Sequence, residues 1–559
     1  MPNGAELFVD AAARLGLDTV FTLVGDHLNE VLAAAAGAGL RIVDMRHESG
    51  ATHAADAWAR IHRRPALALV TGGPGHTNAL TGMATANLAG SPLIAVSGSR
   101  PRVLAERQAF QDIDQVAIAR PAVKWAAEVP QAAQIPFYLR RAWDESNSGR
   151  RGAAHLTIPV DVFTESAAQS SWAAGANPST CGLDIPTKAG EFLRAARRPV
   201  AIAGSGIWWS GAEAALQRFI ESSRIPLYTI TMARGAVSDE HPLCMGYADP
   251  ALNYAVHTAF READLFLVIG KRIDYRLALG GARLFPPEAK FIQVDIHPPE
   301  LGMNRALDAA VCGDARMALE ALAEQAEPAP AAWLDRVRCL RAEWQATLDR
   351  ADADAAVFFR ALREALPQDV LFSWDGGDFA HWGRTILPAR QPGGWLRLGP
   401  LGTIGSSLPN AVALQLAYPG RRVVAITGDG ALGFYLAEMD TLVRHRLPVV
   451  LIVGNDAGWG LERELQGGGA TVACELRPSR YDLVMKAFGG DGATVERADE
   501  VGPAVERAFA SGVPYCINVK IRGARSPFTD WQLAGKQLAG KTQSRESGDT
   551  MSSGTGSRI

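Results

Sequence analysis

Short and nearly continuous apolar runs recur along the chain, and each is followed by a glycine-bearing turn and then by a stretch with helical periodicity. Examples are PALALVTGGPG in the first third, ADLFLVIGK in the middle third and RVVAITGDG in the last third. Apolar runs of this kind are typical of parallel strands that helices cover on both faces. The regular alternation of strand and helix predicts an α/β protein built from doubly wound units.

Two breaks in the pattern divide the chain. Residues 166–184 are rich in Ala, Ser and Gly without periodicity, and residues 325–332 are rich in Pro and Ala, as is typical of linkers. The length of 559 residues suffices for three or four domains of roughly 100–200 residues each. We expect three doubly wound parallel-sheet domains and a flexible C-terminal tail or lid, over residues 1–165, 185–330, 352–530 and 531–559.

Composition excludes several functional classes. The 56 Lys and Arg residues nearly balance the 59 Asp and Glu residues, which gives a net charge of −3 and argues against a nucleic-acid or anionic-membrane partner. The 6 cysteines are scattered without a C-x-x-C pair, so neither a zinc site nor a disulfide framework is expected. No apolar run is long enough to span a membrane, and the first residues lack the pattern of a signal peptide. We therefore expect a cytoplasmic protein.

Two aspartates follow neighbouring strands of the last third. A strand over residues 423–427 ends at Asp429, a helix is expected over about 431–445, and a second strand over 449–453 ends at Asp456. A right-handed crossover places both strand ends at one edge of the sheet, where ligands of such sheets collect. Two neighbouring carboxylates repel each other unless a cation lies between them, and Mg²⁺ prefers to share phosphate oxygens.

The same turn has the features of a phosphate site. Gly428 and Gly430 permit close approach of the backbone, and the following helix offers free N–H groups to an anion. The alternative is that Asp429 only caps a helix and Asp456 only occupies a turn. An isolated GDG would favour that alternative, but the complete GDG–helix–ND arrangement favours a metal–diphosphate site.

This arrangement resembles thiamine diphosphate (ThDP)-dependent enzymes of the acetolactate synthase/decarboxylase superfamily, in which GDG precedes NN or ND by about two dozen residues. The resemblance implies Mg²⁺ ligands at Asp429, Asp456 and the backbone carbonyl of Gly458. Asp456 departs from the commoner Asn but keeps an oxygen ligand. The residues implied to hold the diphosphate are Gly428, Gly430, Ala431, Asn455, Trp459, Gly460 and Leu461.

Two upstream segments extend the resemblance. Ile404 lies 25 residues before Asp429, where related enzymes have the bulky residue that props the cofactor in a bent shape. The carbonyl of Gly402 is then implied to accept the hydrogen bond of the cofactor's 4′-amino group. Without the family, Ile404 is a core residue in a glycine-rich loop. A second segment resembles the loop that closes over the diphosphate, with the cofactor-binding residues Gly377, Asp378 and Phe379.

An acid follows a strand near the N-terminus. LRIVDMRHESG predicts a strand over 40–45 that leads to Glu48 and a helix from about residue 51. On its own, Glu48 is a first-turn acid that the helix dipole favours. The resemblance implies instead that Glu48 hydrogen-bonds N1′ of the cofactor's pyrimidine and thereby activates C2 of the thiazolium.

Other candidates are expected around the pyrimidine. Pro74 and Asn78 belong to a segment that resembles the family's Gly-Pro-Gly loop. His76 is either an acid/base or a structural histidine. Asp26 is either a proton relay, as in relatives of pyruvate decarboxylase, or the cap of a helix that starts near residue 28.

The resemblance also bears on assembly and substrate. In the family the two ends of the cofactor are held by different subunits, which implies a homodimer or homotetramer. Residues 108–124 resemble the equivalent loop of oxalyl-CoA decarboxylases and 2-hydroxyacyl-CoA lyases more than that of acetolactate synthases, and Phe110 and Gln111 are expected to line the substrate pocket.

We therefore expect a lyase that cleaves 2-hydroxyacyl-CoA to an aldehyde or ketone and formyl-CoA, or that runs in reverse as an acyloin condensation. The alternative is a 2-oxo acid carboligase or decarboxylase of the acetolactate synthase type. A third possibility is a catalytically silent scaffold subunit, against which the joint presence of Glu48, Asp429 and Asp456 argues.

The middle domain has the features of a nucleotide site. Gly204, Asp295 and Asp314 follow apolar runs, and a carboxylate near a strand end can bind ribose hydroxyls. The resemblance implies ADP in the oxalyl-CoA branch, FAD in the acetolactate synthase branch, and neither in some relatives. Residues 522–541 hold four cations and two aromatic residues, which is compatible with a lid over CoA or with a solvated helix.

Overall fold

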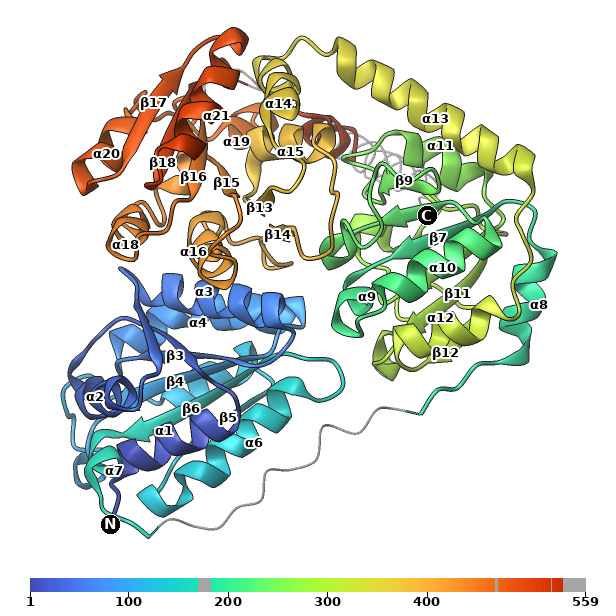
Figure 1. The fold of residues 1–559 in the computed structure, drawn as a ribbon. Helices are drawn as coiled ribbons and strands as arrows, with labels where there is room; N and C mark the ends of the chain where they lie inside the picture. Colours follow the sequence, from blue (N-terminus) through green and yellow to red (C-terminus); the bar gives the residue numbers. More distant parts are fainter. Residues whose placement is uncertain (169–181, 468–470, 524, 536–559) are drawn as a thin grey trace, which may run out of the picture.

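The computed structural model describes residues 1–168, 182–467, 471–523 and 525–535. In these residues the chain forms three six-stranded sheets in which all paired strands are parallel (Figure 1). Helices lie on the faces of each sheet, as the near-continuous burial of the strands requires. The predicted α/β fold with three doubly wound parallel sheets is confirmed.

The N-terminal domain has the strand order β2-β1-β3-β4-β6-β5. Its strands are β1 (Thr19–Thr22), β2 (Arg41–Asp44), β3 (Ala66–Val70), β4 (Leu93–Ser99), β5 (Trp125–Glu128) and β6 (Ala153–Pro159). Its α-helices are α1 (Gly4–Arg14), α2 (Asn29–Gly37), α3 (Glu48–His62), α4 (Pro74–Ala89), α5 (Gln115–Ala119), α6 (Ile135–Asn147) and α7 (Val160–Thr164).

The central domain has the order β12-β11-β10-β7-β8-β9. Its strands are β7 (Pro199–Ala203), β8 (Leu227–Thr229), β9 (Cys244–Tyr247), β10 (Leu265–Ile269), β11 (Lys290–Asp295) and β12 (Ala309–Cys312). The helices of this part are α8 (Thr187–Ala195), α9 (Ser205–Trp209), α10 (Glu213–Ser223), α11 (Ala255–Glu262), α12 (Ala315–Ala323) and α13 (Ala331–Arg350).

Numbered from its own first strand, this central sheet has the order 3-2-1-4-5-6, which is the order of dinucleotide-binding folds. Strands β8 and β9 follow on one side of β7, and strands β10, β11 and β12 follow on its other side. The loops after β7 and β10 therefore separate and leave a crevice, where a ligand is expected.

The C-terminal domain has the order β14-β13-β15-β16-β18-β17, the same winding as the N-terminal domain. Its strands are β13 (Leu371–Trp374), β14 (Trp395–Arg397), β15 (Val423–Gly428), β16 (Val450–Asn455), β17 (Asp491–Val495) and β18 (Tyr515–Lys520). Its α-helices are α14 (Asp354–Ala365), α15 (Gly377–Ile386), α16 (Ser407–Ala417), α17 (Asp429–Leu432), α18 (Glu438–Arg444), α19 (Gly460–Leu465), α20 (Tyr481–Phe488) and α21 (Val501–Ala510).

The N-terminal and C-terminal domains share one hydrophobic core. Helix α3 packs against α16 (Figure 1), and one cluster of buried apolar residues runs from the N-terminal sheet into the C-terminal sheet. Ion pairs close the edge of this contact, among them Arg46 with Asp440 at 2.9 Å and Arg444 with Asp44. The two domains that are expected to hold the two ends of ThDP are therefore fixed against each other within one chain.

The predicted helix over 431–445 is wrong in its extent. The chain makes the short helix α17 and restarts as α18, because a neighbouring loop takes up the space between them. A Cβ on Gly405 would lie 2.7 Å from the carbonyl oxygen of Ala431 and 2.8 Å from side-chain atoms of Phe434 and Tyr435. Helix α3 likewise begins earlier than expected, at Glu48 itself.

The segments between and after the domains are partly described. The first expected linker lies mostly outside the described residues, and the second ends inside α13, which begins at Ala331. Residues 527–535 are helical, and the rest of the expected tail lies outside the described residues. Among the helices of the described ranges, none has the length and apolar character needed to cross a bilayer.

Candidate active site

The two predicted metal-binding aspartates lie side by side. Strands β15 and β16 pair in parallel with Gly428 opposite Gly454, so Asp429 and Asp456 follow at adjoining strand ends, close enough to shift each other's pKa. The backbone N–H of Gly458 donates to Asp429 Oδ2 at 3.1 Å. The structure thus brings the three predicted metal ligands together.

The electrostatics of this pair favour a bound cation. Burial, together with the neighbouring charge of Asp456, raises the pKa of Asp429 to about 7. Burial also raises the pKa of Asp456, although the Arg463 guanidinium at 3.4 Å opposes that shift. Two carboxyls with raised pKa values, one buried and one largely buried, are suited to a divalent cation in place of a shared proton. Within the described ranges no group of three or more His, Cys, Asp and Glu side chains forms a metal cluster, so a metal here would need backbone or ligand oxygens as well.

Three glycines that are predicted to bind the cofactor have open space where a side chain would be. A Cβ on Gly377 or Gly402 would meet no atom within 4 Å, and one on Gly428 would meet only a backbone oxygen at 3.9 Å. Gly377 and Gly402 also have positive φ angles of 83° and 79°, which other residues adopt at a cost. These backbones therefore line open space into which a ligand can fit closely.

The Trp459 side chain covers the opposite side of the turn. A Cβ on Gly430 would lie 2.9 Å from the Trp459 ring, and a Cβ on Gly460 would lie 2.3 Å from Asp456 Oδ2. Asn455 is buried and binds the carbonyl of Ser479 and the side chain of Asn518. Gly430, Asn455, Trp459 and Gly460 thus surround the aspartates, together with Ala431 and Leu461 on the adjoining helices α17 and α19.

A buried carboxylate that the sequence did not single out anchors these loops. Asp375 is fully buried and accepts hydrogen bonds from the N–H groups of Gly376 and Gly405 at 2.8 and 2.9 Å. It also accepts from the hydroxyls of Ser407 and Thr427 at 2.9 and 3.0 Å. Asp375 therefore ties the end of β13 to β15 and to the loop of Gly402 and Ile404.

Ile404 lies next to the start of α15. A Cβ on Gly376 would approach the Ile404 side chain to 3.3 Å. Of the residues predicted for this loop, Gly377 faces open space, whereas Phe379 is buried among Phe358 and Phe359. The burial of Phe379 assigns it to the core of the domain more than to a ligand surface.

Asp378 is held by the C-terminal segment. Its Oδ1 accepts hydrogen bonds from Ser526 and from Thr529 at 2.6 Å, and both hydroxyl residues are fully buried. Phe528 lies over the His381 ring, and the Trp531 ring stacks on Arg283 of the central domain at 3.5 Å. The described part of the expected lid is therefore packed between two domains, with both of its aromatic side chains partly buried.

Glu48 and Asn78 form the second part of the candidate site, where the pyrimidine is expected to bind. Glu48 begins α3, is 8% exposed, and accepts a hydrogen bond from Asn78 Nδ2 at 3.0 Å. Pro74 begins α4, and a Cβ on Gly75 would lie 3.4 Å from Glu48 Oε1. The predicted pyrimidine-binding residues Glu48, Pro74 and Asn78 therefore converge.

His76 and Asp26 lie in other surroundings. His76 is completely buried, where it hydrogen-bonds Ser97 at 2.9 Å and packs on His155, and burial lowers its pKa to about 4. This environment favours the structural alternative for His76. Asp26 is exposed at the start of η1 (Asp26–Leu28), while its neighbour His27 accepts a hydrogen bond from the N–H of Gly72.

The predicted substrate loop is at the surface. Phe110 is 84% exposed, whereas the backbone and Cβ of Gln111 pack on Gly73. Gln115, which the sequence did not single out, is buried and accepts a hydrogen bond from the N–H of Gly73 at 3.0 Å. Gln111 and Gln115 thus both fix the loop that leads into α4.

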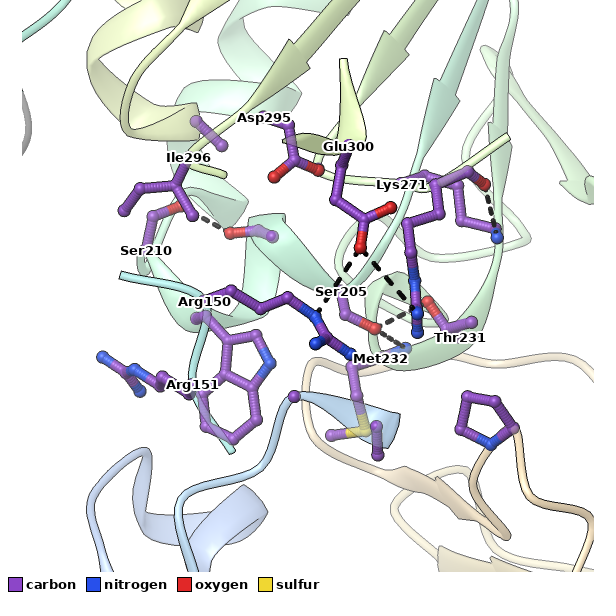
Figure 2. Close-up of a pocket in the computed structure, with 18 of the residues that line it drawn as sticks. Arg150, Arg151, Ser205, Ser210, Thr231, Met232, Lys271, Asp295, Ile296 and Glu300 are labelled. Carbon is purple, nitrogen blue, oxygen red and sulfur yellow. Dashed lines mark hydrogen bonds and ion pairs between the residues drawn. The ribbon is translucent and has the colours of Figure 1, made fainter. Parts of the chain in front are cut away.

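The central domain holds a cavity of about 290 Å³ at the crevice that its strand order predicts (Figure 2). Asp295 and Asp314 line it, whereas Gly204 lies behind it, where a Cβ would meet Gly270 and Lys271 at 2.6 and 2.5 Å. Burial raises the pKa of Asp295.

One wall of this cavity comes from the N-terminal domain. Figure 2 shows Glu300 facing Arg150, at 3.7 Å, and Arg272 lies 3.9 Å from the same carboxylate. The sequence missed these residues because they belong to different domains, and no local motif joins them. A cationic wall opposite Asp295 suits a ligand with both hydroxyl and phosphate groups.

Comparison with known proteins adds three family matches. Residues 2–118 match the family described as "Thiamine pyrophosphate enzyme, N-terminal TPP binding domain", residues 187–322 match its "central domain", and residues 375–519 match its "C-terminal TPP binding domain".

Curated relatives match along most of the chain. A "Probable acetolactate synthase" of Mycobacterium bovis is 36% identical over 90% of this chain and 93% of its own length. An "Oxalyl-CoA decarboxylase" of Escherichia coli is 31% identical over 97% and 99%, and a "2-hydroxyacyl-CoA lyase" of Oryza sativa is 32% identical over 93% and 95%. Both branches are represented at similar identity, so the expected closer likeness to the CoA-dependent branch is not established.

Proposed function

The chain belongs to the thiamine pyrophosphate enzymes, as a ThDP-dependent enzyme of the acetolactate synthase/decarboxylase family, and we propose that it uses ThDP and Mg²⁺ to break or form a carbon–carbon bond next to a carbonyl group. One observation carries the proposal: Asp429 and Asp456 lie together at adjoining strand ends with raised pKa values.

The residues present fit the cofactor and its metal. The two buried carboxyls and the backbone of Gly458 supply oxygen ligands for a hard cation, and the N–H groups of the turn are suited to a diphosphate. The open space beside Gly377, Gly402 and Gly428 suits a ligand that approaches the backbone closely. We propose that Asp429 and Asp456 hold Mg²⁺ and that these turns hold the diphosphate.

When bound, ThDP supplies a carbanion equivalent at C2 of its thiazolium ring, and the protein supplies position and proton control. We propose that the Glu48 carboxyl holds a proton at the pyrimidine N1′. Asn78 Nδ2 fixes the orientation of that carboxyl through its 3.0 Å hydrogen bond. Ile404, which lies beside Gly376, would support the bent shape of a bound cofactor.

We propose that the enzyme is a homodimer or homotetramer with active sites between subunits. Large apolar side chains are exposed along the loop that holds Phe110, among them Val103 at 73% and Ile113 at 38%. Exposed apolar side chains gathered on one segment are typical of a surface that another chain covers.

Two substrate classes are compatible with this chemistry. The first is a 2-hydroxyacyl-CoA, cleaved to an aldehyde or ketone and formyl-CoA; the resemblance of residues 108–124 and the matches to CoA-dependent relatives support it. The second is a 2-oxo acid, decarboxylated or condensed as in acetolactate synthases; the 36% identity over 520 residues supports it.

We further propose a nucleotide such as ADP or FAD in the central cavity. The 3-2-1-4-5-6 strand order and the carboxylate of Asp295 support this proposal, as does the cationic wall of Arg150 and Arg272. An ADP moiety would place its ribose hydroxyls near Asp295 and its phosphates near the arginines. Absorbance of the purified protein distinguishes a bound flavin from ADP.

A substrate panel tests the function. The purified chain is given ThDP and Mg²⁺ and is assayed with pyruvate, longer 2-oxo acids, oxalyl-CoA and 2-hydroxyacyl-CoAs. Release of an aldehyde and formyl-CoA supports the lyase, and acetolactate formation supports the carboligase. No turnover of any member, together with no ThDP binding, contradicts the whole proposal. Asp429→Asn serves as the inactive control.

A further inference from the structure

Two buried arginines and one that is largely buried lie where the central and C-terminal domains pack together. Arg276 belongs to η6 (Tyr275–Gly280), Arg384 to α15, and Arg397 ends β14. Arg384 and Arg397 are only 2% and 5% exposed. Burial lowers the pKa of Arg384 and of Arg397, and the neighbouring charges of Arg397 and of Arg276, respectively, lower these pKa values further, so the guanidinium groups lie within electrostatic reach of each other.

Only one of these arginines has a carboxylate partner. Arg276 Nη1 lies 2.6 Å from Asp249 Oδ2, whereas neither Arg384 nor Arg397 makes an ion pair within the described part of the chain. The Nε and Nη1 atoms of Arg384 and the Nε atom of Arg397 are buried and have no protein partner there. Buried charges of this kind are strongly unfavourable unless a counter-charge is supplied.

The excess of positive charge helps to lower the pKa values of two neighbouring side chains. Burial opposes ionisation of Tyr247, but Arg397 and Arg384 outweigh it and lower the pKa of its phenol. Burial, reinforced by Arg384, lowers the pKa of His381 well below its ordinary value, so its imidazole is neutral and adds no positive charge. The Tyr247 hydroxyl also lacks a partner in the described residues.

The central cavity gives access to this cluster. Arg276 and Arg397 line the cavity, as do Leu398, Gly399 and Pro400, which follow Arg397 in the chain. Arg384 does not line it but lies within electrostatic reach of Arg397. A ligand in the cavity can therefore present a negative group to Arg397 while the charge of Arg384 adds to the positive field.

We propose that Arg397 and Arg384 form an anion-binding pocket at the C-terminal-domain end of the central cavity, which holds a carboxylate or phosphate group of a ligand. The excess of buried arginines over carboxylates supplies the charge, and the guanidinium nitrogens without partners supply the hydrogen bonds. This pocket is distinct from the Asp429–Asp456 pair, and its existence does not depend on the reaction that the enzyme catalyses.

Anion-dependent thermal stability of the full chain tests the proposal. ThDP and Mg²⁺ are kept at saturation so that the diphosphate site does not take up the probe. Inorganic phosphate and oxalate are titrated separately, with chloride at matched ionic strength as the reference. We expect a saturable rise in melting temperature with phosphate or oxalate beyond the effect of chloride. The stronger of the two identifies the pocket as one for phosphates or for carboxylates.

Variants assign the effect to the cluster. Arg397→Gln and Arg384→Gln are each expected to weaken anion binding at least tenfold and to be no less stable than the wild type without the anion, because an unpaired buried charge is removed. The loss in Arg384→Gln is decisive, since this residue does not line the cavity. Arg140→Gln is the matched control: Arg140 in α6 is paired with Asp144 at 2.8 Å and does not line the cavity, so its loss changes the stability equally with and without the anion.

Several results would overturn the proposal. One is a wild-type protein whose stability responds to phosphate and oxalate only as it does to chloride. Another is full anion dependence in Arg384→Gln. A third is a Tyr247 phenolate at neutral pH, seen in the ultraviolet difference spectrum against Tyr247→Phe, because the counter-charge would then come from the protein. If the Gln variants do not fold, Arg397→Lys and Arg384→Lys replace them, and both must still bind the anion because Lys keeps the positive charge. The absence of a specific anion response in the wild type is by itself sufficient to reject the pocket.

Discussion

Glu438 is a buried carboxyl at the contact between the N-terminal and C-terminal domains. It is fully buried in α18, accepts hydrogen bonds from the Arg46 N–H at 3.2 Å and from Thr441 Oγ1 at 2.6 Å, and its Oε1 would lie 2.4 Å from a Cβ on Gly50. Burial raises its pKa from 4.5 to about 7, although the hydrogen bonds of Thr441 and Arg46 oppose the shift. The folded protein therefore holds this proton more tightly than the unfolded chain.

The sign of the pH dependence follows from that difference. Because the pKa is raised in the folded state, the stabilisation is complete below pH 4.5 and is lost as the pH rises through about 7. Raising the pKa of Glu438 from 4.5 to about 7 lowers the free energy of unfolding at pH 8 by about 3 kcal/mol relative to pH 4.5. Glu438→Gln resembles the protonated carboxyl, so it should match the wild type at pH 4.5 and be more stable by up to about 3 kcal/mol at pH 8.

Thermal unfolding between pH 4.5 and 8.5 measures this difference. Asp440→Asn, two residues away, is the matched control with the opposite sign. Burial opposes the shift of Asp440, but the hydrogen bonds of Arg444 and Arg46 lower its pKa, so the variant should lose stability above pH 4. Parallel curves for the wild type and Glu438→Gln across the whole range would show that Glu438 is not buried at a domain contact, and the packing of α3 against the C-terminal domain would be wrong.

Three further predictions concern the candidate site. Asp375→Asn should lower the free energy of unfolding by about 2–4 kcal/mol, measured by denaturant titration, because four donors lose a carboxylate acceptor; an unchanged value would refute the anchoring role. Glu48→Gln should slow C2 proton exchange on bound ThDP by at least about 100-fold while ThDP affinity stays within a few-fold, as NMR would detect; normal exchange removes Glu48 from the chemistry. Ser526→Ala with Thr529→Ala removes both hydroxyl donors to the buried carboxyl of Asp378, so limited trypsin digestion near Arg525 should become faster, and unaltered digestion would show that these bonds do not hold the segment.

Much of the fold is predictable because its strands are buried on both faces. The residues of β3 and nearly all of β15 are buried, and their apolar runs are visible in the sequence. The helix over 431–445 was predicted from local periodicity, but its continuity depends on the loop around Gly405, which is 26 residues away from Ala431 and presses on this turn. Contacts of that kind leave no signal in the local sequence.

Part of the candidate site can likewise be predicted from the sequence, and part of it cannot. Asp429 and Asp456 are predictable because each follows a buried strand and the two match a spaced motif, and Glu48 is predictable because it follows His47 after a strand near the N-terminus. Asp375 and Gln115 are single polar residues whose roles arise only from the loops that they bind in the folded chain. The cavity wall formed by Arg150, Arg272 and Glu300 joins two domains, so its charges become a site only after the domains pack.

The proposed function depends above all on the pair of aspartates as a Mg²⁺ and diphosphate site. Isothermal titration of the full chain with ThDP, with and without Mg²⁺, measures this claim directly. We predict that wild-type binding requires Mg²⁺ and falls at least about tenfold in Asp429→Ala and in Asp456→Ala, while Glu48→Gln keeps it. Binding of ThDP that does not depend on Mg²⁺, or that survives both aspartate substitutions, would contradict the account.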